Sequence, residues 1–163
     1  MRLLLAALLS LPLALAACDS AGGGSGPEPP APATLRAAPT TATVGGADLT
    51  LSAYLWRDFM PSPDAPGDGS GLLGALYVQP AAGAALPPGV RADAAYVLNG
   101  DETWTATPEV AADADLYDRL ALRVADGPKW AVGARVDVVV RLRDDEGRTH
   151  LLRAPDQEIH RTD

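Results

Sequence analysis

The side chains that could perform covalent chemistry are few in this chain of 163 residues. Imidazole is available only from His150 and His160, and Cys18 is the one cysteine. No serine stands in a Gly-x-Ser-x-Gly setting, and neither histidine belongs to a catalytic or zinc-binding motif. We therefore predict no catalytic residue, and we expect the protein not to be an enzyme.

Carboxylates are more numerous and gather in predicted loops. They form three groups: Asp64 with Asp68; Asp113, Asp115 and Asp118; and Asp144, Asp145 and Glu146. Clustered oxygen ligands can bind calcium, but none of these groups has the spacing of an EF-hand loop. Solvated acidic loops explain them most simply, so we predict neither a metal nor a cofactor. Two alternatives stay open: a small exported hydrolase or sugar-active enzyme that uses loop carboxylates, and a calcium-dependent binding domain.

An alternating segment brings two aromatic side chains to one face. Between residues 47 and 56, Leu49, Leu51 and Leu55 share one face of a predicted strand, while Tyr54 and Trp56 share the other. If the leucines face the core, the two rings form a surface able to stack on a sugar or on a partner's apolar patch. Together with the adjacent Arg57, they are our candidate binding surface. The opposite possibility is that a neighbouring loop buries them.

The charge balance excludes one class of partner. Thirteen Lys and Arg against 21 Asp and Glu give a formal net charge of −8. Nucleic acids are bound by clustered basic side chains, so we expect no nucleic-acid partner.

The first 17 residues have the pattern of a secretory signal peptide. Arg2 precedes an apolar stretch that starts at Leu3 and ends in small residues at Ala16 and Ala17. This stretch is shorter than the roughly 20 residues that a membrane-spanning helix needs. We therefore predict that residues 1–17 are a signal peptide that directs export.

The sequence Leu15-Ala16-Ala17-Cys18 resembles the lipobox of bacterial lipoproteins. The resemblance implies that the Cys18 thiol receives a diacylglyceryl group, that the chain is cut before Cys18, and that lipid holds the protein to a membrane of the cell envelope. Cys18 has no second cysteine with which to form an internal disulfide. Whether the inner or the outer membrane carries the anchor stays open.

A tether and one β-rich domain follow. Residues 18–32 contain no large apolar residue, so they are predicted to form a linker that spans roughly 20 Å as a flexible coil. Residues 33–163 alternate with period two rather than with helical spacing. We expect a mainly β domain, an antiparallel Ig-like β-sandwich of about seven or eight strands. The predicted strands lie near 35 and at 47–56, 72–78, 94–98, 101–106, 116–125, 134–143 and 148–153, with one short helix near 108–115.

Two turns set the expected strand registers. Asn99-Gly100 is typical of a type I′ hairpin turn, which would place Tyr96 opposite Thr103. A four-residue turn at 144–147 would place His150 opposite Arg141, on the outer side. We expect Pro155 to end the last strand and the remaining residues to form a polar tail. The stretch from Gly127 to Leu152 resembles the final hairpin of bacterial Ig-like extracellular domains, a resemblance that implies an architecture and no activity.

The sequence thus favours a lipid-anchored envelope protein that binds or scaffolds an envelope protein or a glycan. The anchor is tested by labelling cells with radioactive fatty acid. We expect the wild-type chain to carry the label and the Cys18→Ser variant to carry none, because the serine hydroxyl replaces the thiol that forms the thioether. Label that persists in the variant would contradict the anchor.

Overall fold

The computed structural model describes residues 29–60, 67–81, 84–112 and 118–163. The signal peptide, Cys18 and most of the tether lie outside these residues. The described elements are α1 (Pro32–Arg36), β1 (Thr41–Val44), β2 (Ala47–Asp58), β3 (Leu72–Pro80), β4 (Arg91–Asn99), β5 (Glu102–Ala106), β6 (Glu109–Val110), β7 (Leu120–Gly127), β8 (Arg135–Arg143) and β9 (Thr149–Thr162). The prediction of a mainly β domain is confirmed. Among these elements no helix is long and apolar enough to cross a bilayer.

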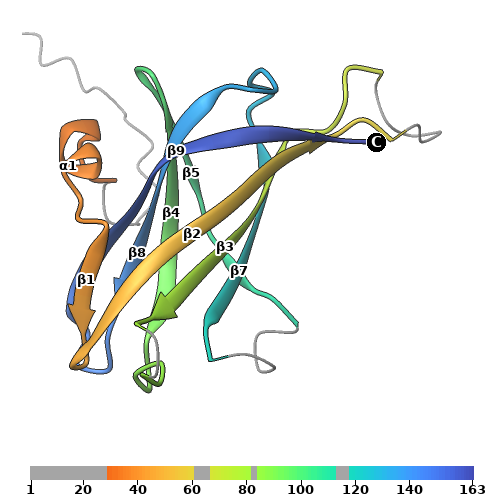
Figure 1. The fold of residues 1–163 in the computed structure, drawn as a ribbon. Helices are drawn as coiled ribbons and strands as arrows, with labels where there is room; N and C mark the ends of the chain where they lie inside the picture. The colour runs from red at the N-terminus through yellow and green to blue at the C-terminus, as the bar shows by residue number, and fades with distance from the viewer. Residues whose placement is uncertain (1–28, 61–66, 82–83, 113–117) are drawn as a thin grey trace, which may run out of the picture.

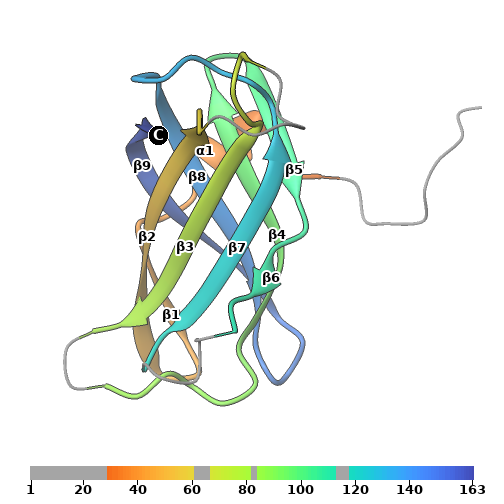
Figure 2. The same ribbon diagram turned by 90° about the vertical axis from the view of Figure 1, so that its right-hand side faces the viewer.

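The strands form one nine-stranded mixed sheet that curls over on itself (Figures 1 and 2). Its order is β5-β4-β8-β9-β2-β3-β7-β6, with β1 added beside β2. One half, β2-β3-β7, faces the other, β4-β8-β9, across a core of Leu, Val, Ile and Ala side chains. The expectation that every strand pair is antiparallel is wrong, because β2 and β9 run parallel from the pair Leu55–Ile159 to the pair Asp58–Thr162.

Strand β9 continues beyond the point where we expected it to end. Pro155 has no N–H to donate, but it lies where the β8–β9 register shifts, and a bulge tolerates a proline. Asp156 takes a positive φ of 54° there, and its N–H donates to the Asp137 carboxylate at 3.0 Å. The strand resumes after this bulge, and Ile159, which we had placed in a polar tail, is fully buried in the core.

The strand expected near residue 35 is instead the short helix α1. Pro32 stands in its first turn, where a missing N–H breaks no helical bond. Leu35 is fully buried in a second apolar cluster with Tyr96 of β4 and Val139 of β8, on the outer side of their half of the sheet. The segment after the helix is held to β9, because the Arg153 N–H donates to the Pro39 carbonyl at 2.8 Å.

The prediction of a helix near 108–115 is also wrong for the residues of this range that the structure describes. Residues Glu109–Val110 form strand β6, which pairs with Arg123 and Leu122 of β7. Residues 113–117 lie outside the described residues. Thr107-Pro108-Glu109 has the side chains of a helix start, but pairing with an open sheet edge prevails over this local preference.

Both predicted hairpins exist, but their registers differ from those expected. The first turn centres on Gly100-Asp101, with Gly100 at φ 56°, so Tyr96 lies opposite Thr105 rather than Thr103. Tyr96 still points away from Trp104, as the alternation predicts.

The last hairpin has five residues between Arg143 and Thr149, so His150 lies opposite Leu142 rather than Arg141. A shift of one residue moves a side chain to the other face of the sheet, so the expected outward placement of His150 is wrong.

Leu35 offers a test of the α1 contact. Leu35→Ala is expected to lower the free energy of unfolding by about 2–5 kcal/mol, as for other buried leucines. Val110→Ala is the control: the side chain of Val110 is 65% exposed, so a change within about 0.5 kcal/mol is expected. Both are measured by urea unfolding. Equal effects of the two substitutions would mean that α1 does not dock stably.

Candidate functional site

The aromatic side chains Tyr54 and Trp56 lie on the outer side of β2, as the alternation predicted. Leu51 and Leu55 point from the same strand into the core. The Tyr54 side chain is 45% exposed, whereas Trp56 is half-buried. The two rings stack with centroids 5.5 Å apart and an interplanar angle of 30°. The expected pair of rings is therefore present at the surface.

A third ring, from His160, joins this pair. The parallel register places His160 of β9 beside Trp56, and its ring stacks on Tyr54 with centroids 4.8 Å apart and planes 15° apart. We call Tyr54, Trp56 and His160 the aromatic row. The binding surface predicted from the sequence does not include His160, because the sequence predicts that the strand ends at Pro155. The available signal was the apolar Ile159 followed by His160, which fits a strand that continues after the proline.

The aromatic row continues into the outer face of β3 and β7. Leu73 lies opposite Trp56, and Ala75 lies opposite Tyr54. Ala75 is only 3% exposed although it points outward, so larger neighbouring side chains cover it. Beyond it, Arg123 of β7 is exposed at the rim. Tyrosine, tryptophan and arginine are the side chains enriched in protein interfaces, so this surface has the composition of a binding face.

Arg57, the third residue of the predicted surface, lies on the opposite side of β2 and is only 7% exposed. Its guanidinium donates to backbone carbonyls of two loops: to Ser70 at 2.9 Å and to Asp68 in one, and to Trp130 at 3.2 Å and Lys129 at 3.4 Å in the other. A buried charge is tolerated when hydrogen bonds surround it. The side chain of Arg57 therefore clamps two loops together and is not part of the aromatic row.

The surroundings of Arg57 strengthen this clamp. The guanidinium carbon of Arg57 lies 5.0 Å from the centroid of the Phe59 ring, and the guanidinium carbon of Arg161 lies 4.1 Å from the same centroid. Cations this close to a ring face are attracted by its quadrupole. The same two loops are also joined by an ion pair between Lys129 and Asp68 at 2.7 Å.

His150, one of the two histidines considered for catalysis, lies beside a carboxylate in the last hairpin. Its Nε2 is 3.1 Å from the Oδ2 of Asp144, a buried residue. The Asp144 carboxylate also accepts hydrogen bonds from the Arg148 backbone N–H at 2.8 Å and side-chain Nε at 2.7 Å. The hydrogen bond from Arg148, foremost, and that from His150 hold the pKa of Asp144 below its ordinary value of 3.8 against the opposing effect of burial. These contacts fix the turn between β8 and β9.

The acidic groups lie only partly within the described residues. Asp64, Asp113 and Asp115 lie outside the described residues. Within the described ranges, no group of three or more His, Cys, Asp or Glu side chains is arranged to hold a metal ion. The calcium-dependent alternative and the hydrolase alternative both stay predictions.

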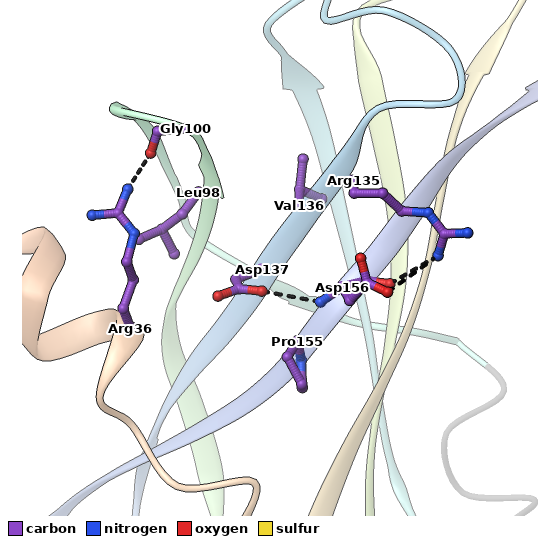
Figure 3. Close-up of a pocket in the computed structure, with 8 residues that line it drawn as sticks. All are labelled: Arg36, Leu98, Gly100, Arg135, Val136, Asp137, Pro155 and Asp156. Atoms are coloured by element: carbon purple, nitrogen blue, oxygen red, sulfur yellow. Dashed lines mark hydrogen bonds and ion pairs between the residues drawn. The ribbon is translucent and has the colours of Figure 1, made fainter.

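A shallow pocket of about 260 Å³ lies between α1, the β4–β5 turn and the β9 bulge (Figure 3). Its charged side chains are paired with groups of the protein. Arg36 donates to the Gly100 carbonyl, Arg135 forms ion pairs with Asp156 at 3.5 Å and with Glu158 at 3.2 Å, and Asp137 accepts from the Asp156 N–H. This arrangement joins the helix to the sheet.

Comparison with known proteins gives no relative. No family model, no curated protein and no solved structure matches this chain. The inference about function therefore rests on the aromatic row, the position of the tether and the sequence before it.

The clamp role of Arg57 is tested by Arg57→Met, which keeps an unbranched apolar stem and removes the guanidinium. We expect a loss of at least about 2 kcal/mol of unfolding free energy, because buried carbonyls lose their donors. Arg123→Met, at an exposed position, is the control and should change stability by less than about 0.5 kcal/mol. Urea unfolding monitored by tryptophan fluorescence measures both. If Arg57→Met were as stable as the control, the hydrogen bonds would not hold the loops.

Proposed function

We propose that this protein is a lipid-anchored, non-catalytic binding module of the bacterial cell envelope, and that the aromatic row forms its binding surface. The observation that carries the proposal is a partly exposed group of three rings on the outside of the sheet, in which Tyr54 stacks on both Trp56 and His160. Apolar ring surface that stays in water costs about 25 cal/mol of free energy per Å² relative to buried surface. A partner that covers the row recovers this free energy.

The position of the tether supports the same use of this surface. Helix α1, the first described element after the tether, packs on the outer side of β4 and β8. The aromatic row lies on the outer side of β2 and of the last residues of β9, where the two halves of the sheet join. In Figure 1, α1 and the strands β3 and β7 stand on opposite sides of the domain. An anchored molecule would thus keep the row clear of its own tether.

We also propose that the domain is related to Ig-like sandwiches. One half of the sheet has the order β2-β3-β7-β6 and the other has the order β5-β4-β8-β9. These orders correspond to strands A-B-E-D and C′-C-F-G of the immunoglobulin fold. Such folds serve many binding functions, so the correspondence supports an architecture but does not indicate a ligand. The ligand has to be inferred from the side chains of the binding surface.

The binding surface is tested by replacing Tyr54 with a photoreactive phenylalanine analogue in the full chain and irradiating whole cells. We expect position 54 to yield an adduct, an envelope protein or a glycan, that the same analogue at Thr149 does not yield. Thr149 is exposed at the start of β9, at the opposite end of that strand from His160. Mass spectrometry identifies the class of partner.

Tyr54→Ala then measures the contribution of the row. We expect a loss of about 2 kcal/mol of affinity for the captured partner, roughly 30-fold, as for interface tyrosines and tryptophans. The melting temperature should change little, because Tyr54 lies on the outside of the sheet and not in the core. Thr50→Ala, an exposed position on the same strand, should alter neither quantity. Unchanged affinity in Tyr54→Ala would remove the aromatic row as the binding surface.

A further inference from the structure

The free edge of β5 is a second surface with backbone groups available for pairing. Strand β5 stands at one end of the sheet order and pairs only with β4 among the described strands. Its side chains Thr103 and Thr105 are exposed. An open strand edge is a template on which another strand can form hydrogen bonds.

The register identifies the backbone groups that face outward. The pair Asn99–Glu102 closes the two-residue turn, and Val97–Trp104 is two positions further along. In an antiparallel ladder these alternate pairs exchange the backbone hydrogen bonds, and the residues between them point their N–H and C=O groups away. Thr103 and Thr105 therefore offer their backbone groups to a further strand. No backbone hydrogen bond from a turn or loop of the described residues reaches either of them.

Strand β5 is only five residues long, but three features that often block such an edge, a proline, a lysine and a bulge, are absent from it. It contains no proline and no lysine, and its register with β4 is unbroken from Ala95–Ala106 to Asn99–Glu102. Its one charged side chain, Glu102, accepts a hydrogen bond from the Trp130 indole N–H at 2.6 Å. The Trp104 ring packs against Gly127 of β7, where an added Cβ would lie 2.9 Å from the ring. This ring therefore covers the core on the inner side of the β5 edge.

We propose that β5 pairs antiparallel with β5 of a second copy of this chain, with Trp104 at the twofold axis. Thr103 then lies opposite Thr105 of the partner subunit, and these two residues exchange both backbone hydrogen bonds. Glu102 lies opposite Ala106 of the partner subunit, so no like charges meet. This register overlaps all of β5, and the interface is isologous, as in most homodimers.

The chain before the domain is what favours a second copy as the occupant. A twofold axis normal to the paired sheets keeps both copies of α1 on the same side, because α1 packs on the outer side of β4 in each copy. Both tethers then reach the same membrane. In this respect the inference rests on the proposed lipid anchor: confinement to one surface raises the effective concentration and offsets the small area of a five-residue strand.

Disulfide crosslinking in membranes tests the register. Full-length Thr103→Cys and Thr105→Cys chains with different tags are produced together and oxidised. We expect at least about tenfold more mixed dimer than either variant forms with itself, because a disulfide needs Cα atoms within about 7 Å. Two copies of Thr103 would be offset by about 7 Å along the strands as well as about 5 Å between them. Thr50→Cys with Ser52→Cys, both exposed on β2, is the matched control.

A second measurement does not depend on added cysteines. Energy transfer between differently labelled copies in vesicles should fall to the background level in the Thr103→Lys, Thr105→Lys double variant, where ammonium groups oppose each other across the strands. It should persist in the Thr50→Lys, Ser52→Lys control. Circular dichroism establishes that each variant is folded.

The possible outcomes distinguish a failure of the β5 pairing from a failure of the lipid anchor. A mixed crosslink no stronger than the control, in protein whose Cys18 carries lipid, overturns the pairing of β5. If Cys18 carries no lipid, the anchor fails, and the same mixed pair is oxidised in a Cys18→Ser background over a series of protein concentrations. A mixed dimer whose yield rises with concentration then supports the pairing, and its absence overturns it.

Discussion

A single strand, β9, connects the two halves of the sheet. Its first part pairs with β8 and its last four residues pair with β2 in the parallel direction. The bulge at Pro155 and Asp156 makes this change of partner possible, because an extra residue bends a strand and increases its twist. Ile159 then enters the core between the two halves. Without the bulge, the strand could not follow both neighbours, and the core would remain open along one side.

The core that β9 closes is made mostly of small and medium side chains, and close approach compensates for their size. At Gly74 an added Cβ would lie 2.8 Å from the Leu55 side chain and 2.8 Å from the Val124 side chain, so the glycine leaves the space that these two side chains fill. At the end of the domain where β2 finishes, Arg57 replaces apolar packing with hydrogen bonds to two loops. Apolar burial and the hydrogen bonds of the Arg57 guanidinium thus both hold the sheet closed.

The same topology distributes the surfaces. Because α1 covers the outside of β4 and β8, the tether enters on one side of the domain, and the outside of β2 and β9 is left for Tyr54, Trp56 and His160. The edge of β5 lies at the end of the sheet, separated from β9 by β4 and β8, and its free backbone groups point along the sheet rather than out of it. A ligand on the rings and a second copy on the edge would therefore occupy separate surfaces.

The β class, most strand positions and the sides of β2 can be predicted from the chain alone, because period-two alternation is a local property. The shared face of Tyr54 and Trp56 follows from the same alternation. Features that depend on distant partners cannot be predicted in this way: Arg57 points inward because two loops supply carbonyls, and residues near 35 are helical because Leu35 packs on the outside of β4. His160 joined the aromatic row only through the parallel pairing of β9 with β2. In the sequence, a proline indicates the end of a strand. Only the register with the neighbouring strand shows whether the proline lies in a bulge, where its missing N–H is tolerated.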